Sequence, residues 1–238
     1  MSEYEKAKAS FSKIPPTARE WLAARRGLGA TLSMQRRFTE AIDLLDEVFR
    51  CAPWDAQTLA VFLRVLTDAG DCERALELGR GYLQGKPPAK TAEITARNAL
   101  GRALLECGKI LEAEQQFAAA LAMSHQQSLL AMYGLMRGSI RGGEPCRFSP
   151  IPIVEQPFDE LRVRMFMVEQ FADDKDDTNA LDFAMAALKL DPQNLAALIR
   201  VAEAHQHMAR QTGDILPAVE ASRAVLMSSP MNNLGLTA

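Results

Sequence analysis

The sequence predicts an all-α protein, an α-solenoid built from antiparallel helix pairs. Alanine and leucine dominate its apolar residues, and aromatic residues make up only 6% of the chain. Alanine and leucine are strong helix formers, whereas β-branched and aromatic residues are typical of strands. A spacing of small and apolar residues also recurs along the chain, as it does in repeat architectures. With 238 residues, 48% of them apolar, the chain has ample material for a core.

The recurring spacing marks a helix with an alanine anchor, apolar or small residues four and seven places later, and a turn residue twelve places later. The four places hold Ala41, Leu45, Val48 and Pro53 in residues 36–55; Ala75, Gly79, Tyr82 and Pro87 in 73–88; Ala113, Phe117, Ala120 and His125 in 111–125; Ala180, Ala184, Ala187 and Pro192 in 180–194; and Ala218, Ser222, Val225 and Pro230 in 217–230. Five occurrences in phase indicate five copies of one unit.

A second helix is expected ahead of each anchor. Thirteen and twelve residues upstream of the first four anchors, and at the shifted place in the fifth, stand Leu28-Gly29, Phe62-Leu63, Leu100-Gly101, Met167-Val168 and Val201-Ala202. The step from Ala41 to Ala75 is 34 residues. Two later steps are 38 residues, because insertions lie around 86–91 and in the loop RQTGDILP.

These residues and this spacing resemble the tetratricopeptide repeat, a 34-residue helix–turn–helix unit, over residues 22–127 and 161–230. The resemblance implies a right-handed superhelix of about five to six repeats. The chain departs from the family pattern at the usual tryptophan, which is replaced by Arg25, Leu59, Arg97, Arg164 and Leu198. It also departs at the usual glycine, which is replaced by Leu63, Val168 and Ala202.

The predicted domain organisation follows the repeats. It comprises an N-terminal capping or half-repeat helix (1–20), a first block of three repeats plus a degenerate helix (21–141), a proline-rich segment (142–158), a second block of two repeats (159–230) and a tail (231–238). Prolines at 145, 150, 152 and 157 forbid a continuous helix through the proline-rich segment. Its apolar residues favour a packed strap, and a hinge between the blocks is the alternative.

The resemblance also implies a binding surface, because tetratricopeptide proteins usually hold ligands in the concave groove lined by the first helix of each pair, here called helix A. The matching helix A positions give the candidate peptide-binding residues Arg26, Gln57, Arg64, Asn98, Arg102, Arg162, Met165 and Glu169. Arginine forks bind carboxylates in bidentate fashion, and asparagine can bond a peptide backbone. The alternative is that the arginines pair with acids on neighbouring repeats. The carboxylate clamp of chaperone-binding family members is not matched.

Catalytic, metal and cofactor sites are not expected. The chain lacks the nucleophile-elbow, zinc-protease, P-loop and dinucleotide-binding motifs. Its four cysteines stand apart without a CxxC pair, so neither a disulfide framework nor a zinc site is predicted and the cysteines are expected to be reduced. The acidic run 173–177 is interpreted as a helix-capping turn. His205 and His207 point about 200° apart on a helix and cannot share a metal.

A net charge of −3 and the lack of aromatic-basic clusters argue against nucleic-acid binding. No stretch reaches the ~18 apolar residues of a membrane span, and the charged N-terminus does not resemble a secretory signal, so a cytoplasmic location is predicted. The leading hypothesis is a non-catalytic scaffold or adaptor that binds a peptide segment or partner protein, with an acidic partner suggested by the arginines. The alternatives are a homo-oligomer formed through open repeat ends and a regulatory subunit of an enzyme or secretion complex.

Overall fold

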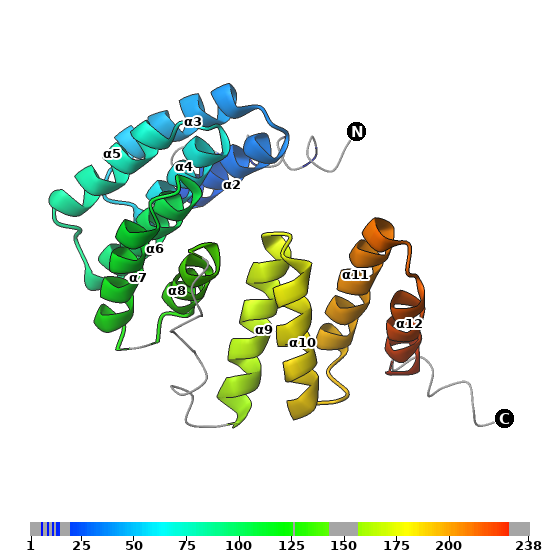
Figure 1. Cartoon of the computed structure of the whole chain (residues 1–238). Helices are drawn as coiled ribbons and strands as arrows, with labels where there is room; N and C mark the ends of the chain where they lie inside the picture. The colour runs from blue at the N-terminus through cyan, green and yellow to red at the C-terminus, as the bar shows by residue number, and fades with distance from the viewer. Residues whose placement is uncertain are drawn as a thin grey trace. The chain divides into compact units, whose positions relative to one another are not determined.

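The computed structural model describes residues 20–125, 127–142 and 157–228, together with residues 6, 9, 11, 13 and 14. Within these residues every regular element is an α-helix (Figure 1). The predicted all-α class of stacked helix pairs is confirmed. The tail 231–238, nearly all of the proline-rich segment and most of the N-terminal segment lie outside the described residues.

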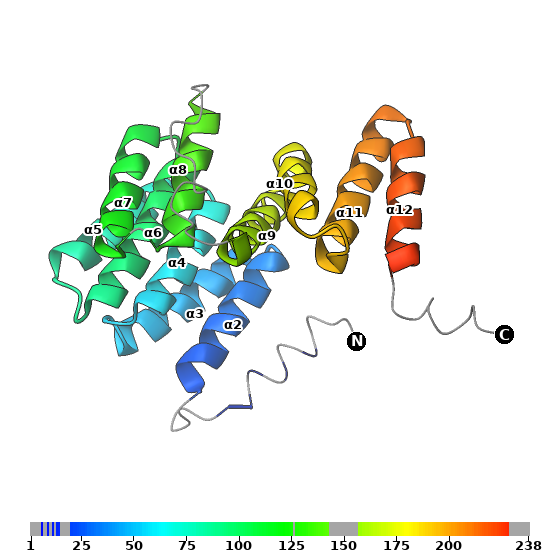
Figure 2. The ribbon, with the colours of Figure 1, turned by 90° about the horizontal axis from the view of Figure 1, so that it is seen from below.

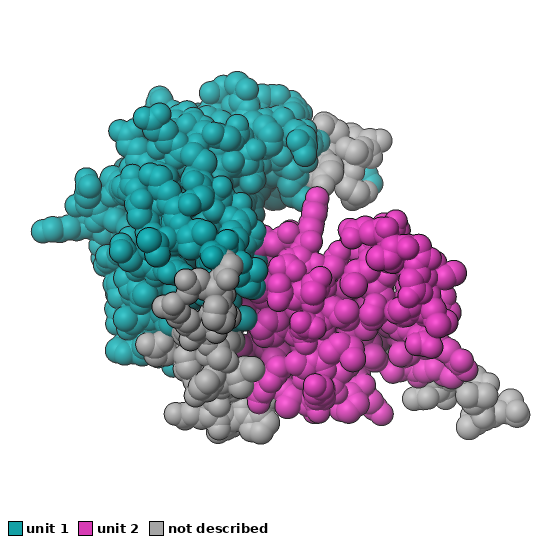
Figure 3. Space-filling model, in the orientation of Figure 1, with its two compact units in different colours: residues 1–148 teal, residues 149–238 magenta. Residues whose placement is uncertain are grey.

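The chain divides into two compact units, Met1–Phe148 and Ser149–Ala238 (Figure 3). The described helices of unit 1 are α2 (Trp21–Met34), α3 (Phe38–Cys51), α4 (Ala56–Asp68), α5 (Cys72–Gln84), α6 (Lys90–Glu106), α7 (Ile110–Met123) and α8 (Leu129–Arg141). Each helix packs on the next along the chain, and α2, α4, α6 and α8 also contact one another in sequence (Figures 1 and 2). These four are the helices A, so they form one layer and α3, α5 and α7 form the other.

The anchoring alanines allow this close packing. Ala41, Ala75 and Ala113 are fully buried at the start of their helices. A glycine on helix A removes the remaining obstacle, because a Cβ on Gly101 would lie 2.9 Å from ring carbons of Phe117 on α7. Large side chains therefore fill the space that small residues leave, as dense packing of the interior requires.

The turn between the two helices of a pair has the same backbone conformation in both units. A residue with positive φ stands at one equivalent place in four pairs: Arg36, Gly70, Gly108 and Lys175. Glycine adopts this left-handed conformation without penalty, so Gly70 and Gly108 are the unstrained versions of the turn. The recurrence supports the phase assigned from the sequence.

Unit 2 contains α9 (Pro157–Asp173), α10 (Asp177–Leu190), α11 (Leu195–Thr212) and α12 (Leu216–Ser228) among its described residues. Val168, Ala184 and Val201 form a small core from three of these helices. Asp176 caps α10 by accepting a hydrogen bond from the Asn179 backbone at 3.2 Å, as the interpretation of the acidic run requires.

The expectation of reduced, separate cysteines is wrong for one pair. Cys72, the first residue of α5, forms a disulfide with Cys107, which follows α6, and their Cα atoms are 5.8 Å apart. The two cysteines belong to the helix–helix turns of successive repeats, and stacking of repeats brings these turns together. Residues separated by 35 positions can therefore pair without any local cysteine motif. Cys51 is free and exposed, and Cys146 lies outside the described residues.

Candidate functional site

The candidate residues of unit 1 share the layer of helices A. Arg26 lies on α2, Gln57 and Arg64 on α4, and Asn98 and Arg102 on α6, and these three helices contact one another in order. The repeat phase therefore places five predicted side chains on neighbouring helices. Their individual contacts differ, and these differences decide which of them can reach a ligand.

Arg26 has a partner within the fold. Its Nη1 donates to Oδ2 of Asp55 at 2.7 Å, and both side chains are about one-fifth exposed, at 23% and 21%. Asp55 also caps α4 by accepting from the backbone N–H of Thr58 at 3.1 Å. Arg26 thus connects α2 to the start of α4. For this arginine the structure shows the alternative interpretation, in which an arginine pairs with an acid on the next repeat.

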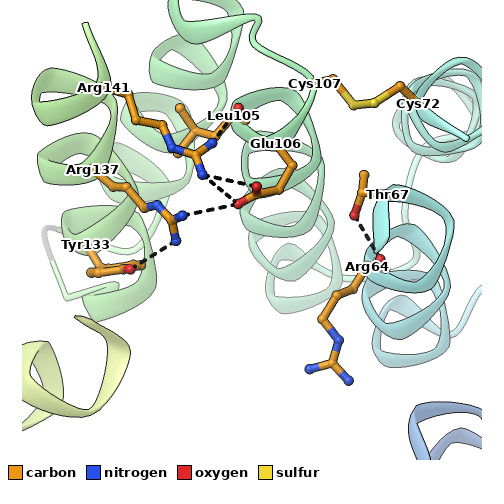
Figure 4. A network of polar contacts seen from close by, with 9 residues as sticks. All are labelled: Arg64, Thr67, Cys72, Leu105, Glu106, Cys107, Tyr133, Arg137 and Arg141. Carbon is orange, nitrogen blue, oxygen red and sulfur yellow. Dashed lines mark hydrogen bonds and ion pairs between the residues drawn. A yellow bond between two sulfur atoms is a disulfide. The ribbon is translucent and has the colours of Figure 1, made fainter. Parts of the chain in front are cut away.

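Arg64 differs, because its side chain is exposed and makes no hydrogen bond or ion pair with other described residues. Its backbone carbonyl accepts from Thr67 Oγ1 at 2.8 Å, while the guanidinium extends away from α4 (Figure 4). Partial burial raises the pKa of the nearby Asp68 carboxyl, and the charges of Arg64 and Arg102 oppose that rise. The two arginines therefore flank a common acidic group.

Asn98 is nine-tenths buried, with 9% of its surface exposed. Its Nδ2 donates to Ser128 Oγ at 3.1 Å, which connects α6 to the N-terminus of α8. Its Oδ1 is buried and accepts no hydrogen bond from the described residues. A buried acceptor without a donor is costly, so the hydrogen-bonding capacity of this oxygen is left unmet within the described residues.

Two arginines on α8 belong to the same region and were not predicted. Arg141 donates to the Leu105 carbonyl at 2.6 Å and to both carboxylate oxygens of Glu106 at 3.2 and 3.0 Å (Figure 4). Arg137 lies 3.4 Å from Glu106 and donates to Tyr133 Oη at 3.3 Å. Burial lowers the pKa of the Arg137 guanidinium from its ordinary value.

The sequence predicted α8 as the degenerate helix that follows the third repeat. Its arginines fall outside the positions that the family uses for ligands, so sequence matching passed over them. The charged groups of this face on α4, α6 and α8 are hereafter called the arginine face: Arg64, Arg102, Arg137, Arg141, Asp68 and Glu106. Four guanidinium groups and two carboxyls leave an excess of positive charge.

The candidates of unit 2 form a separate group on α9. Arg162 is exposed and Met165 is partly exposed. Glu169 is engaged by Arg200 of α11, whose Nε donates to it at 3.0 Å. The hydrogen bond that Arg200 donates to Glu169 is the largest cause of its raised pKa, and the hydrogen bond that it donates to Glu203 also raises that pKa. Glu169 thus joins two helices within unit 2.

A cavity of about 650 Å³ lies on the other layer of unit 1. Phe49 of α3, Tyr82 of α5 and the exposed Trp54 contribute to its lining. Tyr82 Oη donates to the backbone carbonyl of Trp54 at 2.7 Å, and this hydrogen bond joins α5 to the loop between α3 and α4. Sequence reasoning did not identify this cavity, because its lining combines residues of α3 and α5 with Lys86, Pro87 and Pro88 of the insertion.

The described residues contain no group of three or more histidine, cysteine or acidic side chains placed to hold a metal ion. None of their helices combines the length and apolar character needed to cross a membrane.

Comparisons with known proteins gave matches among solved structures. No family model and no curated protein sequence matches the chain. The anaphase-promoting complex hetero-tetramer Cut9–Hcn1 matches with 13% identity and a TM-score of 0.47, covering 96% of this chain and 44% of that one. Human IFIT1, solved as a dimer with m7Gppp-AAAA, matches with 15% identity and a TM-score of 0.47, covering 94% and 45%. This chain therefore spans less than half the length of either.

PilF of Pseudomonas aeruginosa matches with 15% identity and a TM-score of 0.46, covering 100% of this chain and 96% of that one.

The assignment of the fold rests on the described helices of this chain. Buried alanines recur 34 residues apart at Ala41 and Ala75, and the same turn conformation closes four helix pairs. Each of the two units is a stack of tetratricopeptide-like helix pairs.

Proposed function

We propose that unit 1 is a non-catalytic binding module that takes an extended, acidic protein segment across α4, α6 and α8. The observation that carries the proposal is the buried Oδ1 of Asn98, which lacks a donor and lies one helical turn before Arg102. A backbone N–H of an extended segment is the donor that fits this acceptor. The arginine face beside it supplies the charge that selects acidic side chains.

The arginines would act differently in binding. Arg64 is exposed and its side chain is without a partner among the described residues. Its guanidinium can therefore donate two parallel hydrogen bonds to a carboxylate. Arg137 and Arg141 are held by Glu106, so they add positive potential without reorienting. Asp68 and Glu106 would repel a misplaced carboxylate and thereby help to set the register of the bound segment.

Fluorescence anisotropy of an extended glutamate-rich peptide, compared with a lysine-rich peptide of equal length, tests the proposal. We expect the acidic peptide to bind and its affinity to fall with salt, because exposed charges are screened. Arg64→Glu should weaken binding about tenfold or more, which corresponds to ~1.4 kcal/mol. Arg50→Glu is the matched control, since Arg50 is an exposed arginine on α3 in the other layer.

Equal binding of the two peptides, or equal loss in the two variants, would contradict the proposal. Asn98→Leu separates the two parts of the site. It removes the acceptor but leaves the charges, so affinity should fall while the salt dependence is retained. A partner protein with an exposed acidic segment would be bound in the same way, whether this chain acts as an adaptor or as a regulatory subunit.

The cytoplasmic location stays a prediction. Disulfides such as Cys72–Cys107 are typical of oxidising compartments and rare in the cytosol. Trapping of free thiols in intact cells, followed by mapping of the labelled cysteines, distinguishes the two settings. Labelling of Cys72 and Cys107 would support the reduced, cytoplasmic setting, and protection of both would overturn it.

A further inference from the structure

The last described helix of unit 2, α12, carries an apolar stripe on its exposed side. Leu216 is 62% exposed, Val219 57% and Met227 67%. At 100° per residue these positions fall on one side of the helix, opposite the buried Ala218. In the described part of unit 2, α11 is the helix that packs on α12, and it covers the Ala218 side.

Two opposite charges stand in the middle of this stripe. Glu220 and Arg223 are both exposed, and neither makes a hydrogen bond or ion pair with the described residues. Together with Leu216 and Met227 they follow a spacing of four, three and four residues. That spacing is the one at which a helix presents a seam to a second helix.

The seam is complementary to itself when reversed. Leu216 and Met227 are centred on the point between Ala221 and Ser222, and so are Glu220 and Arg223. Two copies of α12 running in opposite directions about a twofold axis through this point therefore pair Leu216 with Met227 at both ends. The same axis brings each Glu220 opposite the other copy's Arg223. A parallel arrangement would instead place like charges together.

We propose that α12 is a homodimerisation surface, at which two copies of this chain pair antiparallel about a twofold axis. Such an interface is isologous, so each favourable contact occurs twice. The apolar ends contribute burial, and the two central ion pairs select the orientation and register. This proposal rests on unit 2 and does not depend on peptide binding by unit 1.

Sedimentation velocity of the full chain over a wide concentration range tests the proposal. We expect the mass to rise from the monomer value of 26.2 kDa towards twice that value. Glu220→Arg places arginine opposite arginine and should raise the dimer dissociation constant about tenfold or more, and Arg223→Glu should do the same. The double variant E220R/R223E restores both pairs and should return the dissociation constant close to that of the parent.

Arg210→Glu on α11 is the control, since Arg210 is also exposed and lies outside the stripe. It should leave the dissociation constant unchanged. All three positions are exposed, so circular dichroism and thermal midpoints of the four variants should match the parent and show that each variant folds.

A monomer at every concentration would overturn the proposal. A dimer that both single charge reversals leave intact would overturn it as well, because another surface would then hold the copies together. A double variant as weak as the single variants would refute the antiparallel register.

Discussion

Unit 1 and unit 2 use the same helix pair with different interiors. The fully buried side chains of unit 1 include Phe62, Leu59 and Leu63, all on one helix, α4. In unit 2 Phe171 and Met167 are also fully buried, whereas Leu181 and Phe183 are only partly buried around the small cluster of Val168, Ala184 and Val201. Unit 1 is also cross-linked by a disulfide and carries the arginine face.

This difference teaches that the repeat pattern specifies how the helices stack but does not specify how deeply their side chains are buried. Both tryptophans, Trp21 and Trp54, lie in unit 1, so their fluorescence reports on that unit while circular dichroism reports on both. The comparison can therefore be tested unit by unit.

The largest effect is expected from removing an aromatic core residue. Phe62 and Phe171 are each 1% exposed, in unit 1 and unit 2 respectively. Phe62→Ala should cost about 3–5 kcal/mol and lower the urea midpoint seen by tryptophan fluorescence. Phe171→Ala should leave that midpoint in place and shift only the circular dichroism transition. Equal shifts of the fluorescence midpoint in both variants would show that the units unfold as one.

Loss of the disulfide is expected to come next. The Cys72–Cys107 bond closes a loop with a sequence separation of 35 residues, so it restricts the unfolded chain of unit 1. Replacing both cysteines by serine should cost unit 1 about 2–4 kcal/mol. Urea unfolding followed by fluorescence measures the loss, and Cys51→Ser serves as the control. If the transition of unit 2 moved equally, the bond would not act on unit 1 alone.

Helix caps should show a smaller difference between the units. Asp55→Ala removes the cap of α4 and the partner of the partly buried Arg26, and should cost about 2 kcal/mol. Asp176→Ala removes the cap of α10, whose contacts are local to Asn179, and should cost about 1 kcal/mol. Thermal unfolding of the two variants measures the costs, and the reverse order would show that the Arg26 pair adds nothing.

The smallest effect concerns pH. Burial raises the pKa of the Asp68 carboxyl in the folded chain above its ordinary value of 3.8. The folded state then binds more protons than the unfolded state just above pH 3.8, so the Asp68 contribution to stability falls as pH rises through the folded pKa. Asp68→Asn should flatten the pH dependence of the unit 1 transition in that window. An unchanged pH profile would contradict the desolvation of this carboxyl.

The predicted site shows how far sequence reasoning reached. The phase of the repeat placed Arg64 and Arg102 on the same face of neighbouring helices A. At 100° per residue, a spacing error of one or two residues would have moved them to another face. It could not tell that Arg26 pairs with Asp55, since that acid belongs to the start of the next repeat. Arg137 and Arg141 were missed because their role depends on Glu106 and the Leu105 carbonyl of α6. Peptide binding by these residues stays a prediction.

The sequence by itself determined the helix pairs, their order and their turns, because small residues at fixed spacing and a left-handed turn residue are local requirements of each repeat. Only the tertiary structure decided which charges are neutralised, which cysteines pair and which polar atom is left without a donor. These features join residues about one repeat apart through the stacking of helices. Stacking sets distances across the molecule that no local spacing encodes, so the acceptor of Asn98 and the Cys72–Cys107 bond became visible only in the folded chain.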